Sequence, residues 1–236
     1  MGIYSIDGEN LLPDLQNAYP SLSMFQSIGI IGDSFASGEI YNSDDSSVNS
    51  DYYNLSWGQI MARMIGATAI NYSKGGLSTK TWLTDITYGL AKLNSETANQ
   101  LYIIALGIND GNSSIPIGTI ADITSDSTNS FYSYYGRIVR AVQSHAPNAI
   151  IMLSTCARWT NVYNPYSTAI KAIGAYYSFP VFDLAENDFF QSSFFSSNQV
   201  HNHPTAINYS AMAKEYKRLI EKALEENASK YKSFVG

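Results

Sequence analysis

The chain has 236 residues, of which 45% are hydrophobic and only 14% are charged, and its formal net charge is −6. This acidic balance, without a cluster of Lys and Arg, argues against a surface built for nucleic acid or for an anionic membrane. The single cysteine, Cys156, excludes an intrachain disulfide. No apolar stretch approaches the roughly 20 residues needed to cross a bilayer, and the start of the chain lacks the pattern of a signal peptide. The compartment is left open, and the low charge suits a secreted or virion-associated protein.

The first half of the chain alternates strand-like and helix-like segments. Residues 1–27 indicate an irregular lead-in, and residues 28–236 a single domain without an internal repeat or a linker. The expected elements are a buried strand at 28–32, a polar surface loop at 39–54, a helix at 57–65 capped by Ser56, a strand at 67–72 and, after a turn at Gly75–Gly76, a helix from Ser78 or Thr79 to about residue 93.

The second half continues this alternation. The expected elements are strands at 101–106, 149–155 and 180–184, a polar loop at 111–128, and helices at 130–145, at 166–177 and from Pro204 to about residue 228. Strands that alternate with helices throughout a chain predict a parallel sheet with helices on both faces.

Residues that can carry chemistry follow the strands of this sheet. Ser34 comes directly after the first strand, Gly76 after the second and Asn109 after the third. His203 stands just before the last helix. Because the carboxyl ends of parallel strands share one edge, we expect these residues to lie together. Taken singly, each has a plainer interpretation as a turn or loop residue, but together they supply the nucleophile, base and oxyanion donors that acyl transfer needs.

These segments carry a family resemblance. Gly32-Asp33-Ser34, Gly76, Gly107-Ile108-Asn109-Asp110 and His203-Pro204 resemble, in order and spacing, the consensus blocks of the SGNH (GDSL-type) serine esterases and hydrolases. The resemblance covers residues 28–225, which is nearly the whole chain. It implies a three-layer α/β/α flavodoxin-like fold with a parallel sheet of about five strands in the order 2-1-3-4-5.

The resemblance also implies roles for individual residues. Ser34 would be the nucleophile and His203 the general base, and the oxyanion hole would consist of the Ser34 and Gly76 amides and the Asn109 side chain. Family members cleave esters, including acetyl groups on sugars, acyl lipids and thioesters. No metal or organic cofactor is expected.

One position departs from the family pattern. The family places an Asp three residues before the histidine, and this chain has Val200 there. Loss of a triad carboxylate costs about four orders of magnitude in rate when the wrong histidine tautomer results. Three explanations compete: a backbone carbonyl accepts the His203 Nδ1–H, a remote acid such as Glu186 or Asp188 swings in, or the enzyme is weak. We favour the carbonyl, since a neutral acceptor still fixes the tautomer.

Further residues fall on the same edge of the predicted sheet. Arg158 and Trp159 follow the fourth strand, either as a pocket wall for a sugar ring or acyl chain or as a solvated Arg beside a half-buried Trp. His201 would border the pocket. A metal site built on His201 and His203 is the less favoured interpretation, because the sequence offers no evident third ligand.

The sequence therefore predicts a serine esterase that hydrolyses short acyl esters, acetyl esters above all, on carbohydrate, because no long apolar lid for lipid is present. A lipid or thioester acyl hydrolase is the alternative substrate class. A weakly active or inactive carbohydrate-binding or structural module is the alternative function, motivated by Val200. A flavodoxin or phospho-receiver domain fits the alternation but not the Gly-Asp-Ser and late His-Pro. The segment Tyr4-Ser5-Ile6-Asp7-Gly8 resembles lead-ins of hydrolase domains in phage tail proteins, so attachment to a larger phage or surface assembly is a further expectation.

Overall fold

Five parallel strands form the central sheet of the computed structural model, which describes residues 21–158 and 161–228. The strands lie in the order β4-β1-β5-β6-β7, which confirms the predicted order 2-1-3-4-5. Their bounds are β1 (Ser27–Gly32), β4 (Thr68–Asn71), β5 (Leu101–Ala105), β6 (Ile150–Ser154) and β7 (Val181–Phe182). β1, β5 and β6 are almost wholly buried, as expected of strands covered on both faces.

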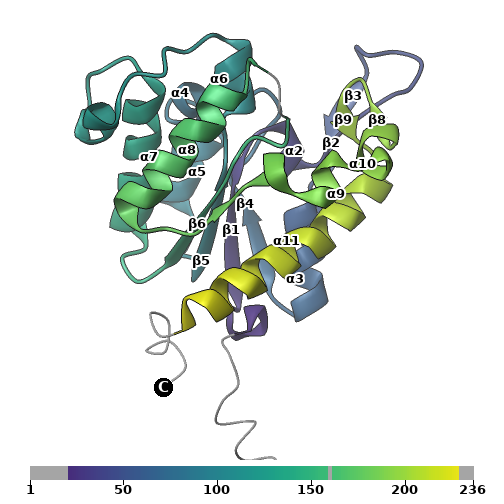
Figure 1. Ribbon diagram of the computed structural model, residues 1–236. Coiled ribbons are helices and arrows are strands. Elements are labelled where there is room, and N and C mark those ends of the chain that lie inside the picture. The colour runs from purple at the N-terminus through teal and green to yellow at the C-terminus, as the bar shows by residue number, and fades with distance from the viewer. Residues whose placement is uncertain (1–20, 159–160, 229–236) are drawn as a thin grey trace, which may run out of the picture.

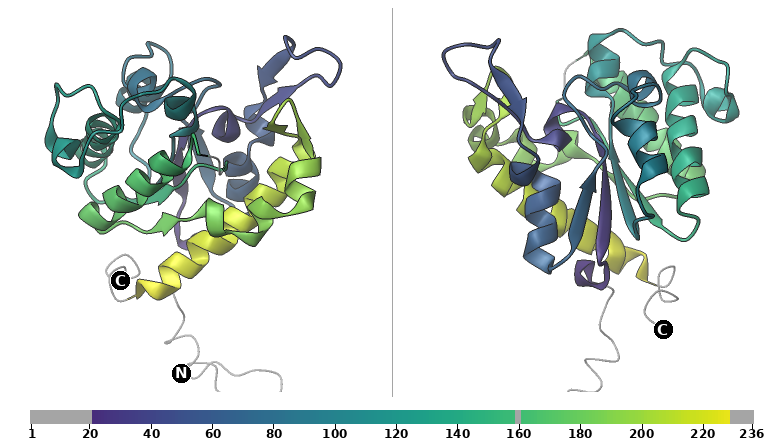
Figure 2. Two further views of the ribbon diagram at one scale, coloured as in Figure 1. Left: turned by 45° about the horizontal axis from the view of Figure 1, so that its top comes forward. Right: turned by 180° about the vertical axis from the view of Figure 1, so that it is seen from behind.

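Helices pack on both faces of the sheet and complete three layers (Figures 1 and 2). One face carries α3 (Trp57–Ile65) and α11 (Ala206–Glu226), which are joined by the rings of Trp57 and Tyr216 stacked at 3.8 Å. The other face carries α4 (Thr79–Trp82), α5 (Gly89–Ser95), α7 (Phe131–His145) and α8 (Asn164–Tyr177). The helix starts follow local capping rules: Ser56 accepts a hydrogen bond from the Gln59 amide and Ser130 from the Ser133 amide.

Shorter elements connect these layers. They are η1 (Leu22–Met24), α2 (Ser34–Ser37), η2 (Tyr53–Leu55), α6 (Ile108–Asn112), η3 (Ile120–Thr124), η4 (Leu184–Glu186), α9 (Asp188–Gln191) and α10 (Ser193–Ser197). Two small antiparallel hairpins are formed by β2 (Glu39–Tyr41) with β3 (Asn49–Asp51), and by β8 (Gln199–Val200) with β9 (His203–Pro204). Both hairpins stand beside α2 at the carboxyl edge of the sheet (Figure 1). The expected lead-in at residues 1–27 lies mostly outside the described residues.

Three expectations of secondary structure were wrong in detail. The helix expected from residue 78 to about 93 is broken after α4, because the Asp85 carboxylate accepts hydrogen bonds from the Thr87 and Tyr88 amides and holds a turn instead. The polar loop at 39–54 contains the β2–β3 hairpin. Pro204 belongs to β9 rather than to the last helix, which begins at Ala206.

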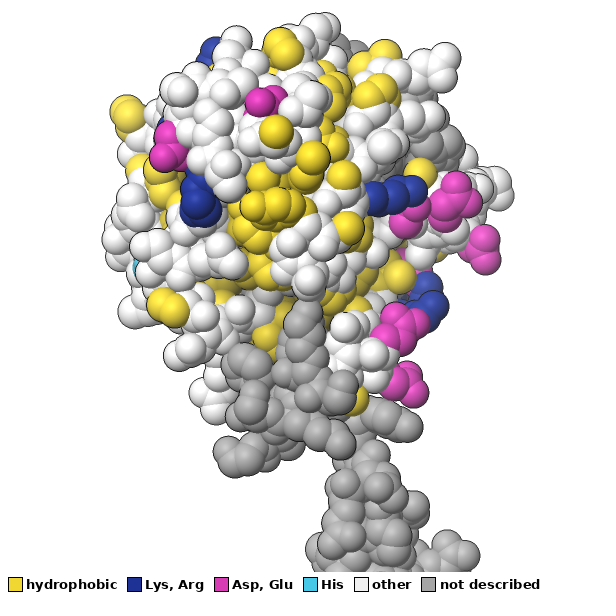
Figure 3. All heavy atoms as spheres, turned by 60° about the vertical axis from the view of Figure 1, so that its left-hand side comes forward, with side chains coloured by type: hydrophobic (Ala, Val, Ile, Leu, Met, Phe, Trp, Pro, Cys, Tyr) yellow, Lys and Arg dark blue, Asp and Glu magenta, His cyan; other side chains and the backbone are white. Residues whose placement is uncertain are grey.

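Few residues of this chain are charged, and its surface shows this. The face in Figure 3 carries mainly uncharged polar and hydrophobic side chains, with few charged groups, as expected for a chain in which 14% of residues are charged. In the described part of the chain, no helix has both the length and the apolar character that crossing a membrane requires.

Candidate active site

Ser34 is the first residue of α2 and stands directly beyond the end of β1. The strand turns directly into the helix, and this tight turn requires glycine at position 32, because a Cβ on that residue would lie only 2.5 Å from the Cβ of Ala36. Asp33 caps the helix by accepting a hydrogen bond at Oδ1 from the Phe35 amide, at 3.0 Å. This turn presents the Ser34 hydroxyl at the carboxyl edge of the sheet, as the sequence predicts.

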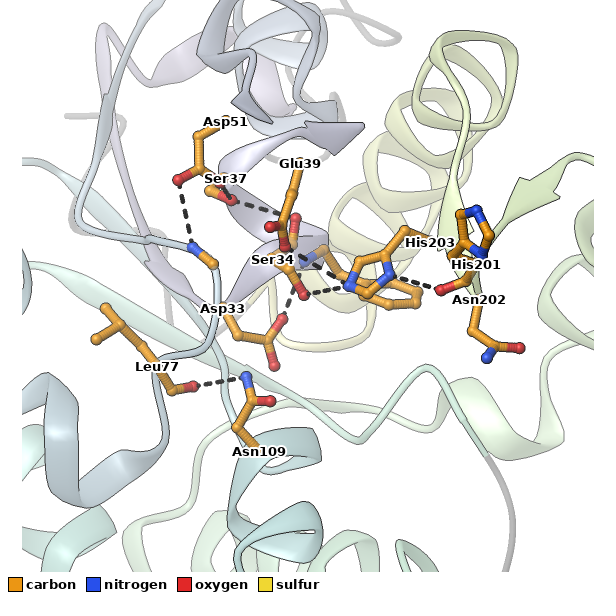
Figure 4. Close-up of polar contacts among 12 residues, drawn as sticks. Asp33, Ser34, Ser37, Glu39, Asp51, Leu77, Asn109, His201, Asn202 and His203 are labelled. Carbon is orange, nitrogen blue, oxygen red and sulfur yellow. Dashed lines mark hydrogen bonds and ion pairs between the residues drawn. The ribbon is translucent and has the colours of Figure 1, made fainter. Parts of the chain in front are cut away.

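His203 reaches Ser34 from the β8–β9 hairpin. His201 and Asn202 form the turn of this hairpin and both have left-handed backbones, with φ of 47° and 61°, as a two-residue hairpin turn requires. The Nε2 atom of His203 lies 3.0 Å from the Ser34 Oγ atom (Figure 4). Its Nδ1 atom lies 3.0 Å from the backbone carbonyl oxygen of His201. With Nδ1–H donating to that carbonyl, Nε2 presents its lone pair to the serine hydroxyl.

In the described residues, a backbone carbonyl and not a carboxylate lies at Nδ1 of His203. Val200 pairs with His203 across the hairpin, and the predicted backbone carbonyl is present at Nδ1. Neither Glu186 nor Asp188 takes that place. Among the carboxylates of the described residues, only that of Glu39 lies within 4.0 Å of a His203 ring nitrogen, and it faces Nε2, at 3.6 Å, rather than Nδ1.

The other predicted oxyanion donors are the Gly76 amide and the Asn109 side chain. Gly76 has a left-handed backbone, with φ of 80°, and open space where a Cβ would stand, so the backbone conformation and not crowding favours glycine here. The Nδ2 atom of Asn109 donates to the Leu77 carbonyl at 3.1 Å (Figure 4). An amide nitrogen carries two hydrogens, so this bond orients the Asn109 side chain and leaves a second donor.

A buried acid supports the two loops that carry these donors. Asp110 is fully buried and its carboxylate accepts hydrogen bonds from the amide and the hydroxyl of Thr79. Burial raises the pKa of Asp110 to about 6, while the Thr79 hydrogen bonds oppose the rise. Because Thr79 starts α4 and Asp110 lies in α6, this contact ties the Gly76 loop to the Asn109 loop.

The site disfavours positive charge on His203. Burial is the main cause that lowers the pKa of His203, and the charges of Arg158 and His201 lower it further, while the hydrogen bond to the His201 carbonyl acts in the opposite direction. The imidazole is therefore held in the neutral form that a general base requires.

Asp33, next to Ser34 in the chain, is fully buried, and burial raises its pKa to about 7.

The remaining candidates from the sequence have distinct surroundings. The Arg158 guanidinium donates from Nη2 to the Asn202 carbonyl and lies 5.2 Å from the centre of the Phe35 ring, so Arg158 braces the hairpin turn. His201 lies against Tyr41, with ring centres 5.9 Å apart. Trp159 falls outside the described residues. Within the described residues, no three His, Cys, Asp or Glu side chains gather in a way that could hold a metal ion.

Sequence reasoning assigned no role to Glu39 or Asp51, the two acids of the β2–β3 hairpin. Glu39 and Tyr41 contact His203, and Asp51 accepts hydrogen bonds from the Ser37 hydroxyl and, at 3.4 Å, from the Gly75 amide. Their only signal in the sequence is that an acid follows the nucleophile by five residues inside a polar stretch. That signal is too common in loops to single them out.

Two other features take no part in the contact between Ser34 and His203. Cys156 is buried beside the same small cavity as Asp33, and burial raises the pKa of its thiol to about 12, which makes it a structural residue. A hollow of about 350 Å³ lies at the opposite edge of the sheet and holds no comparable group of catalytic side chains. It is lined by Met24, Phe25, Ala98, Asn99, Gln100, Ala146, Pro147, Asn148 and Ala149.

Known proteins share this fold. Residues 30–211 match the GDSL-like Lipase/Acylhydrolase family. No match was found among curated proteins. Similar solved structures include a possible lipase from Chitinophaga pinensis (15% identity, TM-score 0.60, covering 84% of this chain and 98% of that chain). Another is the psychrotrophic esterase EstA from Pseudoalteromonas sp. (18% identity, TM-score 0.60, covering 84% of this chain and 98% of that chain). A third is a family two carbohydrate esterase from Clostridium thermocellum in complex with cellohexaose (16% identity, TM-score 0.56, covering 84% of this chain and 64% of that chain). At these identities the likeness establishes the fold.

Proposed function

Because this chain belongs to the GDSL-like lipase and acylhydrolase family, a family of ester hydrolases, we propose that it hydrolyses short acyl esters through an acyl-enzyme on Ser34. The observation that carries the proposal is the 3.0 Å contact between Ser34 Oγ and His203 Nε2, with Nδ1 held at 3.0 Å by the His201 carbonyl. This is a nucleophile in hydrogen-bond contact with a base whose tautomer is fixed.

The acylation step follows from these contacts. As Ser34 Oγ attacks the ester carbonyl carbon, its proton passes to His203 Nε2 and an imidazolium forms. The tetrahedral intermediate then collapses, and Nε2–H gives its proton to the departing alkoxide. In the second half of the reaction, a water molecule attacks the acyl carbon and loses a proton to Nε2. As the bond to Ser34 Oγ breaks, Nε2–H returns that proton to Oγ, which releases the carboxylic acid and regenerates the serine.

The developing oxyanion needs donors that are fixed before the reaction. The Ser34 amide, at the start of α2, the Gly76 amide and the second hydrogen of Asn109 Nδ2 would supply them. Asp110 and Thr79 hold the two loops in register, so these donors need little reorganisation as the charge forms.

The proposed substrate is an acetyl ester on carbohydrate. Polar and aromatic groups surround the His203 side of the site, with Tyr41 stacked on the imidazole at 4.5 Å and His201 at the rim. Such groups pack on sugar rings and bond to sugar hydroxyls. The similarity to a carbohydrate esterase that binds cellohexaose supports this choice over a lipid or thioester.

The test is hydrolysis of a panel of aryl acetates, acetylated sugars, lipid esters and thioesters by the unmodified protein, Ser34→Ala and His203→Ala. We expect Ser34→Ala to abolish turnover of p-nitrophenyl acetate and His203→Ala to reduce it by about three orders of magnitude or more. A serine-directed fluorophosphonate should label Ser34 in the unmodified protein. Activity that persists in Ser34→Ala would refute the assignment, and a protein that neither turns over esters nor reacts with the probe would be a binding module of the same fold.

A further inference from the structure

The carboxylate of a Ser-His-Asp triad has two tasks. It orients the histidine through Nδ1, and it stabilises the positive charge that the ring acquires. In this chain the neutral His201 carbonyl occupies the Nδ1 position, so it performs the first task without supplying a negative charge. The charge-stabilising task has no group at Nδ1.

Glu39 is the acid that stands beside the dyad. Its Oε2 atom lies 3.6 Å from His203 Nε2, and the two side chains are 11% and 17% exposed. This distance is too long for a hydrogen bond, so Nε2 stays free for Ser34 Oγ and then for the leaving oxygen. It is short enough for a strong charge interaction in a site largely screened from water.

Several independent contacts fix the Glu39 carboxylate in this place. The Tyr41 hydroxyl donates to it, and the Tyr41 ring is stacked on the imidazole of His203. On the other side the carboxyl group lies against Gly75, where a Cβ would come within 3.0 Å of three of its atoms. The Glu39 backbone is anchored as well, because the buried Tyr209 hydroxyl donates to the carbonyls of both Ser34, at 3.1 Å, and Glu39, at 2.8 Å.

The other charges around His203 oppose the imidazolium. Arg158 and His201 both lower its pKa, and burial lowers it most. Tyr41 faces the ring as a neutral phenol, because burial and Glu39 raise the pKa of its hydroxyl. Burial and the charge of Asp51 raise the pKa of Glu39, while its hydrogen bond with Tyr41 lowers it. Where its carboxylate is ionised, Glu39 stands close enough to His203 Nε2 to offset the charge formed on the ring.

We infer that Glu39 is the electrostatic partner of the catalytic dyad, and that the two tasks of a triad carboxylate are divided between the His201 carbonyl at Nδ1 and the Glu39 carboxylate beside Nε2. Glu39 acts through His203 and is a positioning residue. It keeps its own proton state during the step, in which the Ser34 proton moves to Nε2 and later to the leaving oxygen. The inference rests on the proposed esterase function and specifies how that site works without an acid at Val200.

The experiment compares Glu39→Gln with the unmodified protein over about pH 5 to about pH 9, using p-nitrophenyl acetate. We expect kcat/KM to fall about 10- to 100-fold, because the imidazolium loses a nearby negative charge. The acid limb of the pH profile should move to lower pH, since the free histidine also becomes harder to protonate. Asp44→Asn is the matched control, as it removes the same charge from the exposed tip of the same hairpin. It should leave both quantities unchanged.

A second variant separates charge from packing. Glu39→Asp keeps the negative charge at a slightly greater distance from His203. The acid limb of its pH profile should therefore lie closer to the acid limb of the unmodified protein than to the acid limb of Glu39→Gln. Equal losses in Glu39→Asp and Glu39→Gln, an unchanged limb in Glu39→Gln, or the same loss in Asp44→Asn would each overturn the inference. Ser34→Ala distinguishes this from failure of the proposed function: if Ser34→Ala abolishes turnover while Glu39→Gln does not alter it, the esterase stands and the role of Glu39 is wrong.

Discussion

Replacing Asp33 with Asn should stabilise the protein at neutral and alkaline pH. The Asp33 side chain is buried, its Oδ2 atom has no hydrogen-bond partner in the described structure, and it borders a small cavity walled mainly by apolar side chains such as Phe35 and Trp57. Burial raises the pKa of Asp33 from 3.8 to about 7. Ionising this group in the folded protein is therefore costly.

The difference in pKa between the folded and unfolded states sets the sign and the size of the effect on the free energy of unfolding. Between pH 3.8 and about pH 7 the unfolded chain has lost the Asp33 proton while the folded protein retains it, so the free energy of unfolding falls as the pH rises through this window. About three pKa units at 1.36 kcal/mol each amount to about 4 kcal/mol. Asn cannot ionise, and its side-chain oxygen can still accept the hydrogen bond from the Phe35 amide. The variant should gain up to about 4 kcal/mol above pH 7 and nothing below about pH 4.

Urea unfolding of both proteins at several pH values between about 4 and 8 measures this difference. The unfolding free energy of Asp33→Asn minus that of the unmodified protein should rise with pH through the window set by the two pKa values. A difference that does not depend on pH would show that Asp33 is ionised at little cost in the folded protein. Burial would then not control the ionisation of Asp33.

Three further substitutions test other parts of the site. Tyr209→Phe removes the buried hydroxyl whose single hydrogen is shared between the Ser34 and Glu39 carbonyls, at 3.1 and 2.8 Å. This should cost about 1–3 kcal/mol, which a thermal melt would record as a fall in Tm of roughly 2–10 °C. Asn109→Ala should lower kcat for p-nitrophenyl acetate by roughly a hundredfold or more with little change in KM, because the lost donor acts on the transition state. Gly75→Ala places a Cβ 2.8 Å from a Glu39 carboxylate oxygen, and because that carboxylate ends a flexible side chain, the melt should change little while kcat/KM falls as in Glu39→Gln. Wild-type kinetics in Gly75→Ala would contradict this.

The framework of the site could be predicted because it depends on local and periodic signals. The β1 strand ends at Gly32 for reasons visible in the sequence, and parallel strands deliver the residues that follow them to one edge. Ser34 and His203, which are 169 positions apart, could be assigned to one site in this way. The helix cap at Ser56 could also be predicted, because a serine before an amphipathic stretch indicates the start of a helix.

The hairpins could not be predicted, because long-range contacts define them. Strands of two or three residues carry too little periodicity to separate from a loop. The β8–β9 turn also uses non-glycine residues, His201 and Asn202, in left-handed conformations that a sequence seldom reveals. Glu39 comes to lie beside the histidine only when β2 packs against β9, so its place near the dyad appears in the structure and not in the motif.

The division of tasks between a carbonyl and an acid on a different hairpin also explains how Val200 is compatible with a working dyad. A backbone carbonyl is present whatever the side chain, so fixing the Nδ1 tautomer depends on the turn geometry at His201 and not on the identity of residue 200. The negative charge then has to come from an element that the three-residue spacing does not specify, and here the β2 strand provides it. A substitution that alters the turn, such as Asn202→Pro, should therefore damage activity more than Val200→Ala. Kinetics on p-nitrophenyl acetate would show this as a large loss in the first variant and a small one in the second, and the reverse order would contradict the role given to the His201 carbonyl.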